Sequence, residues 1–424
     1  MNRIVINYGI VPIGLLLIAL VMNLLHIPNH AIAIVSGVLI FLLAELPLFL
    51  IQQNTNKETG RAFNFITFLF LFILIASLFF ALQNIIIPRR ISIILAVLSG
   101  VAFIYFVFNE LKKKRLAFKR LSFIHFYLVF LLFIVINVPF QLQAPDYTFN
   151  PKIENPAYEK GNGPIIFIDE GHNNYHTLKD RLIATGQLLE NDGYIVLPLN
   201  ETIRIDKLNE CSVLIIINAL NEKNENLELP IFSAFSEKEI SDITQWVSEG
   251  GSLLLIADHM PFPEAINDLA NKFGFNFENG HAMDTIGSPD YFIRNQKTLH
   301  SNYITNGSYS NESVDSILTF SGSAFTIPDN AVSILEFDSN WVSYNPERAW
   351  DFDNVKPISI KGYSQGAFKE FGKGRVAVYG EAMMFTAQLG AGLSWMKIGM
   401  NSEMCPQNYQ LLLNTIHWLD GITN

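Results

Sequence analysis

The sequence changes character near residue 140, where long apolar stretches give way to a chain punctuated by glycine, proline and acidic residues. One helix needs roughly 20 apolar residues to cross the hydrocarbon core of a bilayer. In the first third of the chain, five stretches are apolar and close to that length or longer: 4–25, 31–51, 63–87, 91–108 and 123–138. The sequence therefore predicts a five-helix transmembrane region over residues 1–139.

Charge divides along the same boundary. Residues 1–140 carry 11 Lys and Arg against 3 Asp and Glu, whereas the rest of the chain carries 18 against 36. Because basic residues concentrate in cytoplasmic loops, the run at 112–120 predicts a cytoplasmic loop before the fifth helix. An odd number of helices then predicts a cytoplasmic amino terminus and an extracytoplasmic carboxyl-terminal domain at the inner or plasma membrane. That domain is acidic and would repel phosphates, so nucleic acid is excluded as a partner.

Residues 140–163 form a polar linker that contains proline, and a globular domain follows over residues 164–424. Short apolar runs alternate there with segments of helical period, as expected for buried strands connected by helices. The strand candidates are 164–169, 194–199, 213–218 and 252–258. Ser236 and Glu239 match the capping box that starts a helix. The pattern predicts a flavodoxin-like α/β domain with a mostly parallel sheet, and a β-rich insertion is expected at 280–356.

Three segments carry a resemblance to a known family: GGSLLLIADH at 250–259, GKGRVAVYGEAMMF at 372–385 and NYQLLLNTIHWLDG at 408–421. Together with the order of strands and helices, they resemble the class I glutamine-amidotransferase-like fold. More narrowly, the chain is similar to an uncharacterised bacterial membrane family and to the extracytoplasmic domain of gliding-motility ABC auxiliary proteins, which is related to an intraflagellar-transport domain. The resemblance implies the strand order two, one, three, four. Ligands would then bind between the first and third strands, outside their carboxyl ends.

The chain departs from the amidotransferase pattern at the nucleophile. Members of that class carry a cysteine at the turn after the strand that corresponds to residues 252–258, where this sequence has Asp258 and His259. Cys211 and Cys405 precede the third strand and the final helix, so neither lies at that turn. Without a thiol there, covalent attack on a glutamine amide has no nucleophile, and glutaminase activity is excluded.

Polar residues follow several predicted strands at the point where each strand ends. Because the carboxyl ends of parallel strands meet at one edge of a sheet, we expect these side chains to lie close together. Five of them carry carboxylate or imidazole groups suited to proton transfer and are the catalytic candidates: Asp169, His172, Asp258, His259 and Glu381. Six more are the ligand-binding candidates: Glu170, Asn173, Asn174, His176, Asn218 and Asn221.

Three interpretations of this cluster stay open. A metal site would use His172 and His176, which are four residues apart, but the glutamate of the H-E-x-x-H motif is missing and the helix is expected to begin only after them. Acid and base chemistry without a metal would use the five catalytic candidates, although the sequence identifies no nucleophile. Binding would use the amide and acidic side chains together with aromatic residues of the β-rich region, which suit sugars or peptides.

Of these interpretations the sequence favours binding. We expect a membrane-anchored extracytoplasmic domain that recognises a cell-envelope ligand, such as a glycan or a peptide, or that joins membrane-protein partners in an assembly. The alternative is a hydrolase that uses the strand-end Asp, His and Glu side chains, with or without a bound metal. The sequence assigns no cofactor.

We predict that alkylation of both cysteines leaves ligand binding intact, because neither thiol lies at the strand-end turn. Binding measured before and after iodoacetamide treatment checks this, with circular dichroism to show that the protein stays folded. A glutaminase activity that alkylation abolishes would contradict the prediction.

Overall fold

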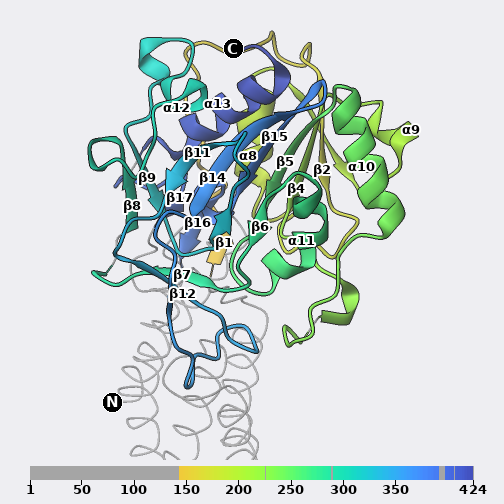
Figure 1. Ribbon diagram of the computed structural model, residues 1–424. Coiled ribbons are helices and arrows are strands. Elements are labelled where there is room, and N and C mark those ends of the chain that lie inside the picture. Colours follow the sequence, from red (N-terminus) through yellow and green to blue (C-terminus); the bar gives the residue numbers. More distant parts are fainter. Residues whose placement is uncertain (1–142, 225, 288–289, 391–396, 405, 424) are drawn as a thin grey trace, which may run out of the picture. The chain divides into compact units, whose positions relative to one another are not determined.

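The computed structural model describes residues 143–424, except 225, 288–289, 391–396, 405 and 424 (Figure 1). Nearly all of them belong to one compact unit, Ala144–Leu389 together with Lys397–Asn424. A nine-stranded sheet runs through the described part. Its strands run in both directions, and helices pack against it, so this unit is an α/β domain with a mixed sheet.

The predicted five-helix transmembrane bundle is corrected by this structure. Within the described residues, no helix is both long and apolar enough to cross a membrane. The longest ones, α10 (Glu237–Glu249) and α13 (Asn408–Asp420), have 13 residues each. That length is about 20 Å, whereas a bilayer core is about 30 Å thick. The multi-pass topology, the extracytoplasmic placement and the membrane localisation derived from the bundle are therefore not supported. The five apolar stretches themselves lie within 1–142, outside the described residues.

Five strands of the main sheet run parallel. In spatial order they are β3 (Ile195–Leu199), β2 (Ile165–Asp169), β4 (Val213–Ile217), β5 (Ser252–Ile256) and β15 (Gly374–Tyr379). Every residue of β4 and β5 is buried, as expected for parallel strands that are covered on both faces. The predicted order of the first four strands, two, one, three, four, is confirmed.

The other half of the sheet is antiparallel, which corrects the prediction of a mostly parallel sheet. Its strands are β14 (Ser364–Phe371), β10 (Phe325–Thr326), β6 (Asn276–Phe277) and β11 (Val332–Glu336). β14 joins β15 through a tight turn at Gly372 and Lys373, and a chain that reverses so directly can only pair antiparallel. Gly372 has a φ of 62°, and a Cβ there would lie 2.5 Å from the carbonyl oxygen of Ser248. Glycine is therefore required at this turn.

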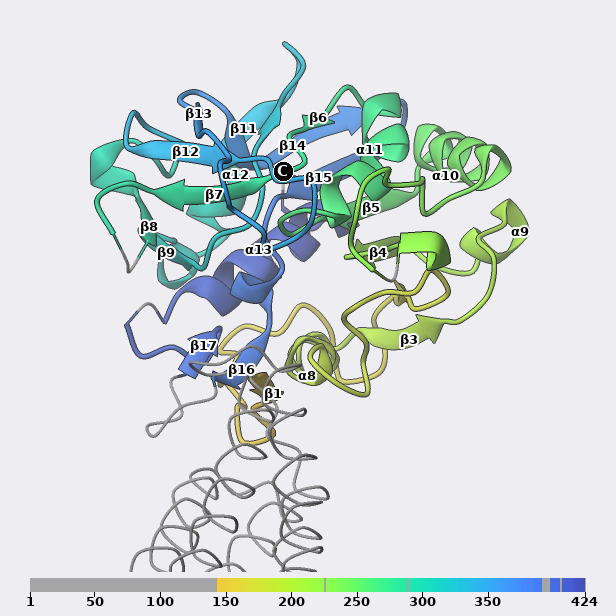
Figure 2. The ribbon, with the colours of Figure 1, turned by 90° about the horizontal axis from the view of Figure 1, so that it is seen from below.

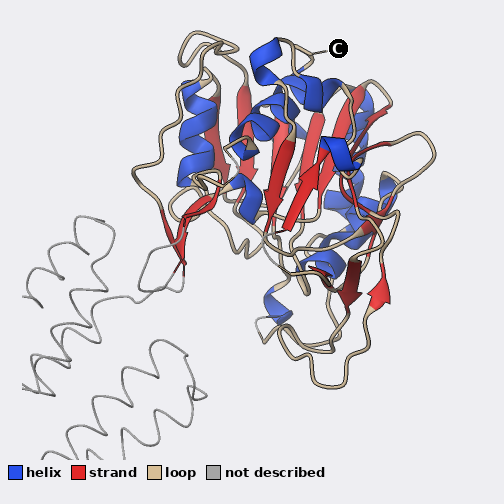
Figure 3. Cartoon of the chain, turned by 90° about the vertical axis from the view of Figure 1, so that its left-hand side faces the viewer, coloured by secondary structure: helices blue, strands red, loops and turns tan. Residues whose placement is uncertain are grey.

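The remaining α-helices of the described part are α8 (Ile183–Asn191), α9 (Ile205–Leu208), α11 (Phe262–Lys272) and α12 (Tyr303–Asn306). Helices lie on both sides of the sheet (Figure 3). Leu253 and Leu255 of β5 belong to one core, with residues of α10 and α11, whereas Leu254 and Ile256 belong to a second core, with residues of α8 and α13. This division follows from the two-residue period of a strand.

Three smaller sheets complete the described part. They are β7 (His281–Asp284) with β12 (Trp341–Tyr344) and β13 (Ile358–Ser359); β8 (Asp290–Ile293) with β9 (Ser316–Thr319); and β1 (Gln143–Pro145) with β16 (Ala387–Gly390) and β17 (Lys397–Gly399). Short 3₁₀ helices are η2 (Glu222–Asn224), η3 (Arg294–Gln296), η4 (Ser310–Glu312) and η5 (Met383–Phe385). β7 and β12 lie side by side (Figure 2). Two residues of this region are used below. His281 is the first residue of β7, and Trp350 lies in the connection between β12 and β13.

We predict that Leu255→Ala destabilises the domain by about 2 to 5 kcal/mol, because it leaves a cavity in a strand that is buried on both faces. Urea unfolding of the two proteins measures the difference. Val332→Ala on β11 is the matched control, since Val332 is 44% exposed and its truncation should change the free energy of unfolding by less than about 0.5 kcal/mol. Equal losses in the two variants would contradict the assignment of the core.

Candidate functional site

The carboxyl ends of β2, β4, β5 and β15 lie along one edge of the parallel half-sheet, because these strands are paired in register. Asp169 is the last residue of β2, Asn218 follows β4, and Asp258 and Glu381 follow β5 and β15 by two residues. All four side chains are buried. The structure thus brings the predicted candidates to one edge, but their hydrogen bonds divide them into separate groups.

The first group holds His172 between two carboxylates. Its Nδ1 lies 2.8 Å from Oδ1 of Asp169, and its Nε2 lies 2.9 Å from Oε1 of Glu239. Because carboxylate oxygens accept, both nitrogens donate and the ring is an imidazolium. Burial alone would lower the pKa of His172, but the hydrogen bonds to Asp169 and Glu239 outweigh it and raise the pKa. With both nitrogens occupied, His172 is not free to move a proton to or from a ligand.

Glu239 is the residue of this group that the sequence did not assign to the site. It is also the glutamate of the predicted capping box, which is confirmed at the start of α10, where Ser236 and Glu239 bond each other's backbone N–H. Oε1 of Glu239 further accepts from the N–H of Ile203 at 3.0 Å. Burial raises the pKa of Glu239, but the bonds from Ser236 and His172 prevail and lower it. The capping pattern could have identified this residue, but it carried no sign of the contact with His172.

The second group joins β4 to the turn after β5. Asn218, in the left-handed region with a φ of 47°, accepts from the N–H of Asp258 at 2.8 Å and lies 3.0 Å from Nδ1 of His176 through its amide nitrogen. Nδ1 of His176 is therefore an acceptor. Burial, followed by the charges of Arg181 and His259, lowers the pKa of His176 to about 3, so its ring is neutral.

Glu381 forms a third group with backbone donors. Its Oε1 and Oε2 accept from the N–H groups of Met383 at 2.6 Å and Met384 at 2.8 Å, which caps η5. Burial, and then the charge of Asp258, raise the pKa of Glu381 well above its ordinary value. Both oxygens are occupied inside the protein.

A fourth group is aromatic and contains a residue that the sequence analysis missed. The rings of His259 and His281 are stacked, with centroids 4.4 Å apart and planes 9° apart, and Trp350 meets both rings edge-on, at 4.4 and 4.6 Å. Nδ1 of His259 lies 2.8 Å from the carbonyl oxygen of Met260, so it donates, and when the ring is neutral its Nε2 carries no proton and can accept. His281 precedes no recognisable motif, and it is brought here by the pairing of β7 with β12 and by the bond from the N–H of Met260 to the carbonyl oxygen of Gly280.

The other ligand-binding candidates hold loops together. Oε1 of Glu170 accepts from the N–H of Leu178 at 2.6 Å. Asn174 donates to Asp169, and Asn221 donates to the carbonyl oxygen of Ser233 at 2.7 Å. Asn173 has a φ of 45° and donates weakly, at 3.4 Å, to the carbonyl oxygen of Leu220. In the described part of the chain, no group of three or more His, Cys, Asp or Glu side chains is arranged to hold a metal ion.

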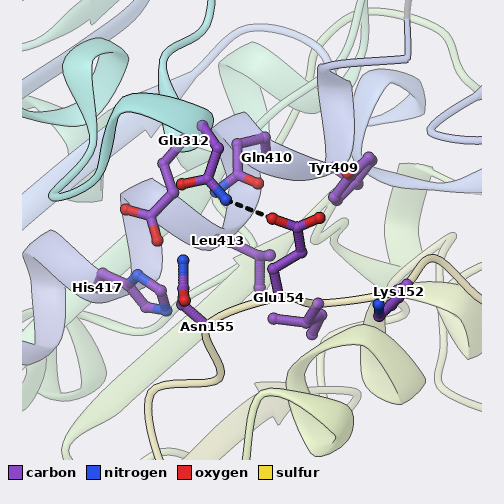
Figure 4. A pocket seen from close by; sticks show the side chains of 10 residues that line it. Lys152, Glu154, Asn155, Glu312, Tyr409, Gln410, Leu413 and His417 are labelled. Atoms are coloured by element: carbon purple, nitrogen blue, oxygen red, sulfur yellow. Dashed lines mark hydrogen bonds between the residues drawn. The ribbon is translucent and has the colours of Figure 1, made fainter.

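A cavity of about 160 Å³ lies against α13, and none of the predicted site residues lines it (Figure 4). Glu154, Glu312 and His417 of its lining have hydrogen-bond partners. Oε2 of Glu154 accepts from Asn311 at 2.7 Å, and Glu312 accepts from two backbone N–H groups. Nε2 of His417 lies 2.6 Å from Oδ2 of Asp192. These bonds join the segment 152–157 to η4, and they join α13 to Asp192 at the end of α8, so the polar lining holds chain segments together.

Cys211 is unsuited to nucleophilic chemistry. It lies just before β4, and its thiol is 3.3 Å from the carbonyl oxygen of Leu208. Burial raises its pKa to about 12, so the thiolate is scarce near neutral pH. Cys405 lies outside the described residues.

Comparison with known proteins shows similarity to solved structures alone. No protein-family model matches the chain, and no curated protein matches it. The N-terminal domain of mmIFT52 is 13% identical, with a TM-score of 0.42, and the match covers 61% of this chain and 97% of that one. A ThuA-like protein from Bacteroides uniformis is 12% identical, with a TM-score of 0.33, over 65% and 95% of the two chains. The cytoplasmic protein STM3548 from Salmonella typhimurium is 14% identical, with a TM-score of 0.36, over 60% and 98%.

These neighbours include an intraflagellar-transport domain and ThuA-like proteins of the glutamine-amidotransferase-like fold, and they are loosely consistent with the fold expected from the sequence. Similarity at this level of identity concerns the fold and not the function.

We predict that the contacts of His172 with Asp169 and Glu239 make the free energy of unfolding fall as the pH rises. Its pKa is raised in the folded state, so its contribution is complete below the ordinary value of 6.5 and is lost as the pH rises through the folded-state pKa. Urea unfolding from about pH 6 to about pH 9 measures this loss. His172→Gln, which cannot be charged, should cost about 3 to 5 kcal/mol near pH 6 and flatten the profile.

His300→Gln is the matched control for this experiment. His300 pairs with Glu336 at 3.0 Å, but its side chain is 37% exposed, so its loss should cost less than about 1 kcal/mol. A His172→Gln profile as steep as that of the unaltered protein would contradict the prediction.

Proposed function

We propose that this domain is a binding module that recognises a glycan at the carboxyl edge of its parallel strands. The observation that carries the proposal is Trp350, which is 57% exposed and rests on the stacked rings of His259 and His281. A large exposed aromatic ring beside buried polar groups is typical of a surface that stacks on a ligand and orients it by hydrogen bonds.

A second exposed aromatic residue supports this proposal. Tyr175 is 53% exposed, and its ring lies 6.0 Å from that of Phe262, which in turn lies 6.2 Å from the ring of His259. The guanidinium of Arg181 lies over the Tyr175 ring at 4.4 Å and steadies it. Aromatic rings thus lie on two sides of His259, as a glycan longer than one sugar would require.

A hydrolase is the second candidate, and His259 is the observation in its favour. Its Nε2 is an acceptor, as a general base must be, and Asp258 precedes it in the chain. The other catalytic candidates support this activity less, because both ring nitrogens of His172 are bonded to carboxylates, and Glu381 is buried with each oxygen bonded to a backbone N–H. A hydrolase would therefore depend on Asp258 and His259, with water as the nucleophile.

Two finer points belong to the proposal. The more specific sequence resemblance, to gliding-motility ABC auxiliary proteins, would make this domain a recognition component of a larger assembly. The expected cell-envelope origin of the ligand depended on the corrected localisation, so the ligand is proposed by its chemistry alone.

We predict that Trp350→Ala weakens binding of a neutral oligosaccharide at least about tenfold, which corresponds to about 1.4 kcal/mol, because the stacking surface is removed. Isothermal titration calorimetry with chito- and manno-oligosaccharides measures this. Tyr309→Ala is the matched control, since Tyr309 is 60% exposed and is not among the residues of the strand edge. Equal affinities of the Trp350→Ala variant and the unaltered protein would contradict the proposal.

A further inference from the structure

His281 is buried without satisfying its polar atoms. Its exposed fraction is 0%, and neither Nδ1 nor Nε2 makes a hydrogen bond of full geometry, although the backbone of Tyr344 lies close enough to act as a weak partner. The backbone of Tyr344 is near enough to oppose the fall of its pKa, but burial first and His259 second lower that pKa to about 3. The ring is therefore neutral, with one N–H donor and one bare acceptor nitrogen. A buried polar group without a partner destabilises the folded protein, so it requires an explanation.

The rings over His281 come from the loop that connects β12 to β13. Trp350 and Phe352 both meet His281 edge-on, at 4.6 and 4.9 Å between ring centroids. Both belong to the connection between β12 and β13, most of which is exposed. Trp350 itself has a φ of 68°, a left-handed conformation that is unusual and strained for a bulky side chain.

A second loop holds this connection over the site. The N–H of Leu229 donates to the carbonyl oxygen of Glu347 at 3.1 Å, and the N–H of Ala349 donates to that of Leu227 at 3.1 Å. Arg348 also lies 3.5 Å from Glu228, in an exposed ion pair. Loop contacts of this kind, near solvent, are among those that open most readily in a folded protein. The two loops together thus cover the histidine pair, and the contacts that join them are of the kind that open readily.

The ring nitrogens of His281 and His259 that lack a hydrogen bond indicate which ligand groups could bond to them. His281 offers one donor and one acceptor, and Nε2 of His259 offers a further acceptor. A carboxylate or a fully ionised phosphate only accepts, and an ammonium only donates, so none of these groups satisfies both nitrogens of His281. Hydroxyl groups do both. Trp350 adds an apolar face for a ring that carries such hydroxyls.

We propose that His281 is a ligand-binding residue for a neutral polyhydroxylated ring, which reaches it when the Trp350 loop moves off the histidine pair. This inference rests on the proposed glycan-binding function and adds to it the residue that selects neutral hydroxyls, together with the loop that covers that residue. It explains why an unpaired imidazole is kept beneath a strained tryptophan.

Variants of His281 in the full chain test this proposal with neutral oligosaccharides as the probes. His281→Phe should lower affinity at least about tenfold, because it removes both polar atoms. The same variant should melt a few degrees higher than the unaltered protein without sugar, because an unsatisfied polar group is replaced by an apolar ring. His281→Gln keeps a donor and an acceptor, and it should restore part of the affinity. His300→Phe is the matched control and should leave affinity unchanged.

Hydrogen–deuterium exchange at the imidazole carbon measures access to His281 independently of any ligand. Exchange should be slow in the unaltered protein and at least several-fold faster in Trp350→Ala. Unchanged exchange would overturn the role of the loop as a cover.

The outcomes separate this inference from the function on which it rests. Binding that Trp350→Ala weakens and His281→Phe leaves intact would overturn the role of His281 and leave the glycan site standing. Tighter binding of glucosamine than of glucose, if Asp258→Asn abolished the difference, would overturn the selection of neutral hydroxyls. The Asp258 carboxylate would then be recognising the charged amino group of glucosamine. No binding of any neutral sugar by the unaltered protein would overturn both proposals.

Discussion

The ends of the parallel strands impose one demand on the rest of the domain. Backbone groups that leave the sheet there are buried, and each must find a new partner. Asn174 donates to the carbonyl oxygen of Ile217 for this reason. Asn218 accepts from the N–H of Asp258, and Glu381 accepts from two N–H groups after β15. Much of the polar character of this edge is therefore a property of the fold, and binding must use what remains.

Local patterns in the sequence predicted a large part of the fold. The strands β2, β4 and β5 and the capping box of α10 are confirmed, because each depends on residues that are near one another in the chain. Two strands of the antiparallel half, β6 and β10, were missed because they have only two residues each, too few to show a period. The hydropathy of residues 1–139 predicted membrane helices, which the described helices, with at most 13 residues, do not supply.

The candidate site was predictable as a location but not as a set of interactions. Strand ends indicated the edge, because parallel strands deliver their last residues to the same place. Which atoms remain available there depends on contacts between distant parts of the chain. His172 meets Glu239, 67 residues away, and His259 meets the first residue of a strand from another sheet. No spacing in the sequence encodes either contact.

Glu239 links the connection that follows β2 to the connection between β3 and β4. One oxygen fixes the first turn of α10, and the other holds the imidazolium of His172 and the N–H of Ile203. Through these bonds Glu239 connects the start of α10 to the segment after β2, which carries His172, and to the segment after β3, which carries Ile203. A displacement of one of these segments would therefore strain its bonds to the other two. These bonds hold the part of the edge that carries His172, and the proposed movement of the β12–β13 loop would leave them in place.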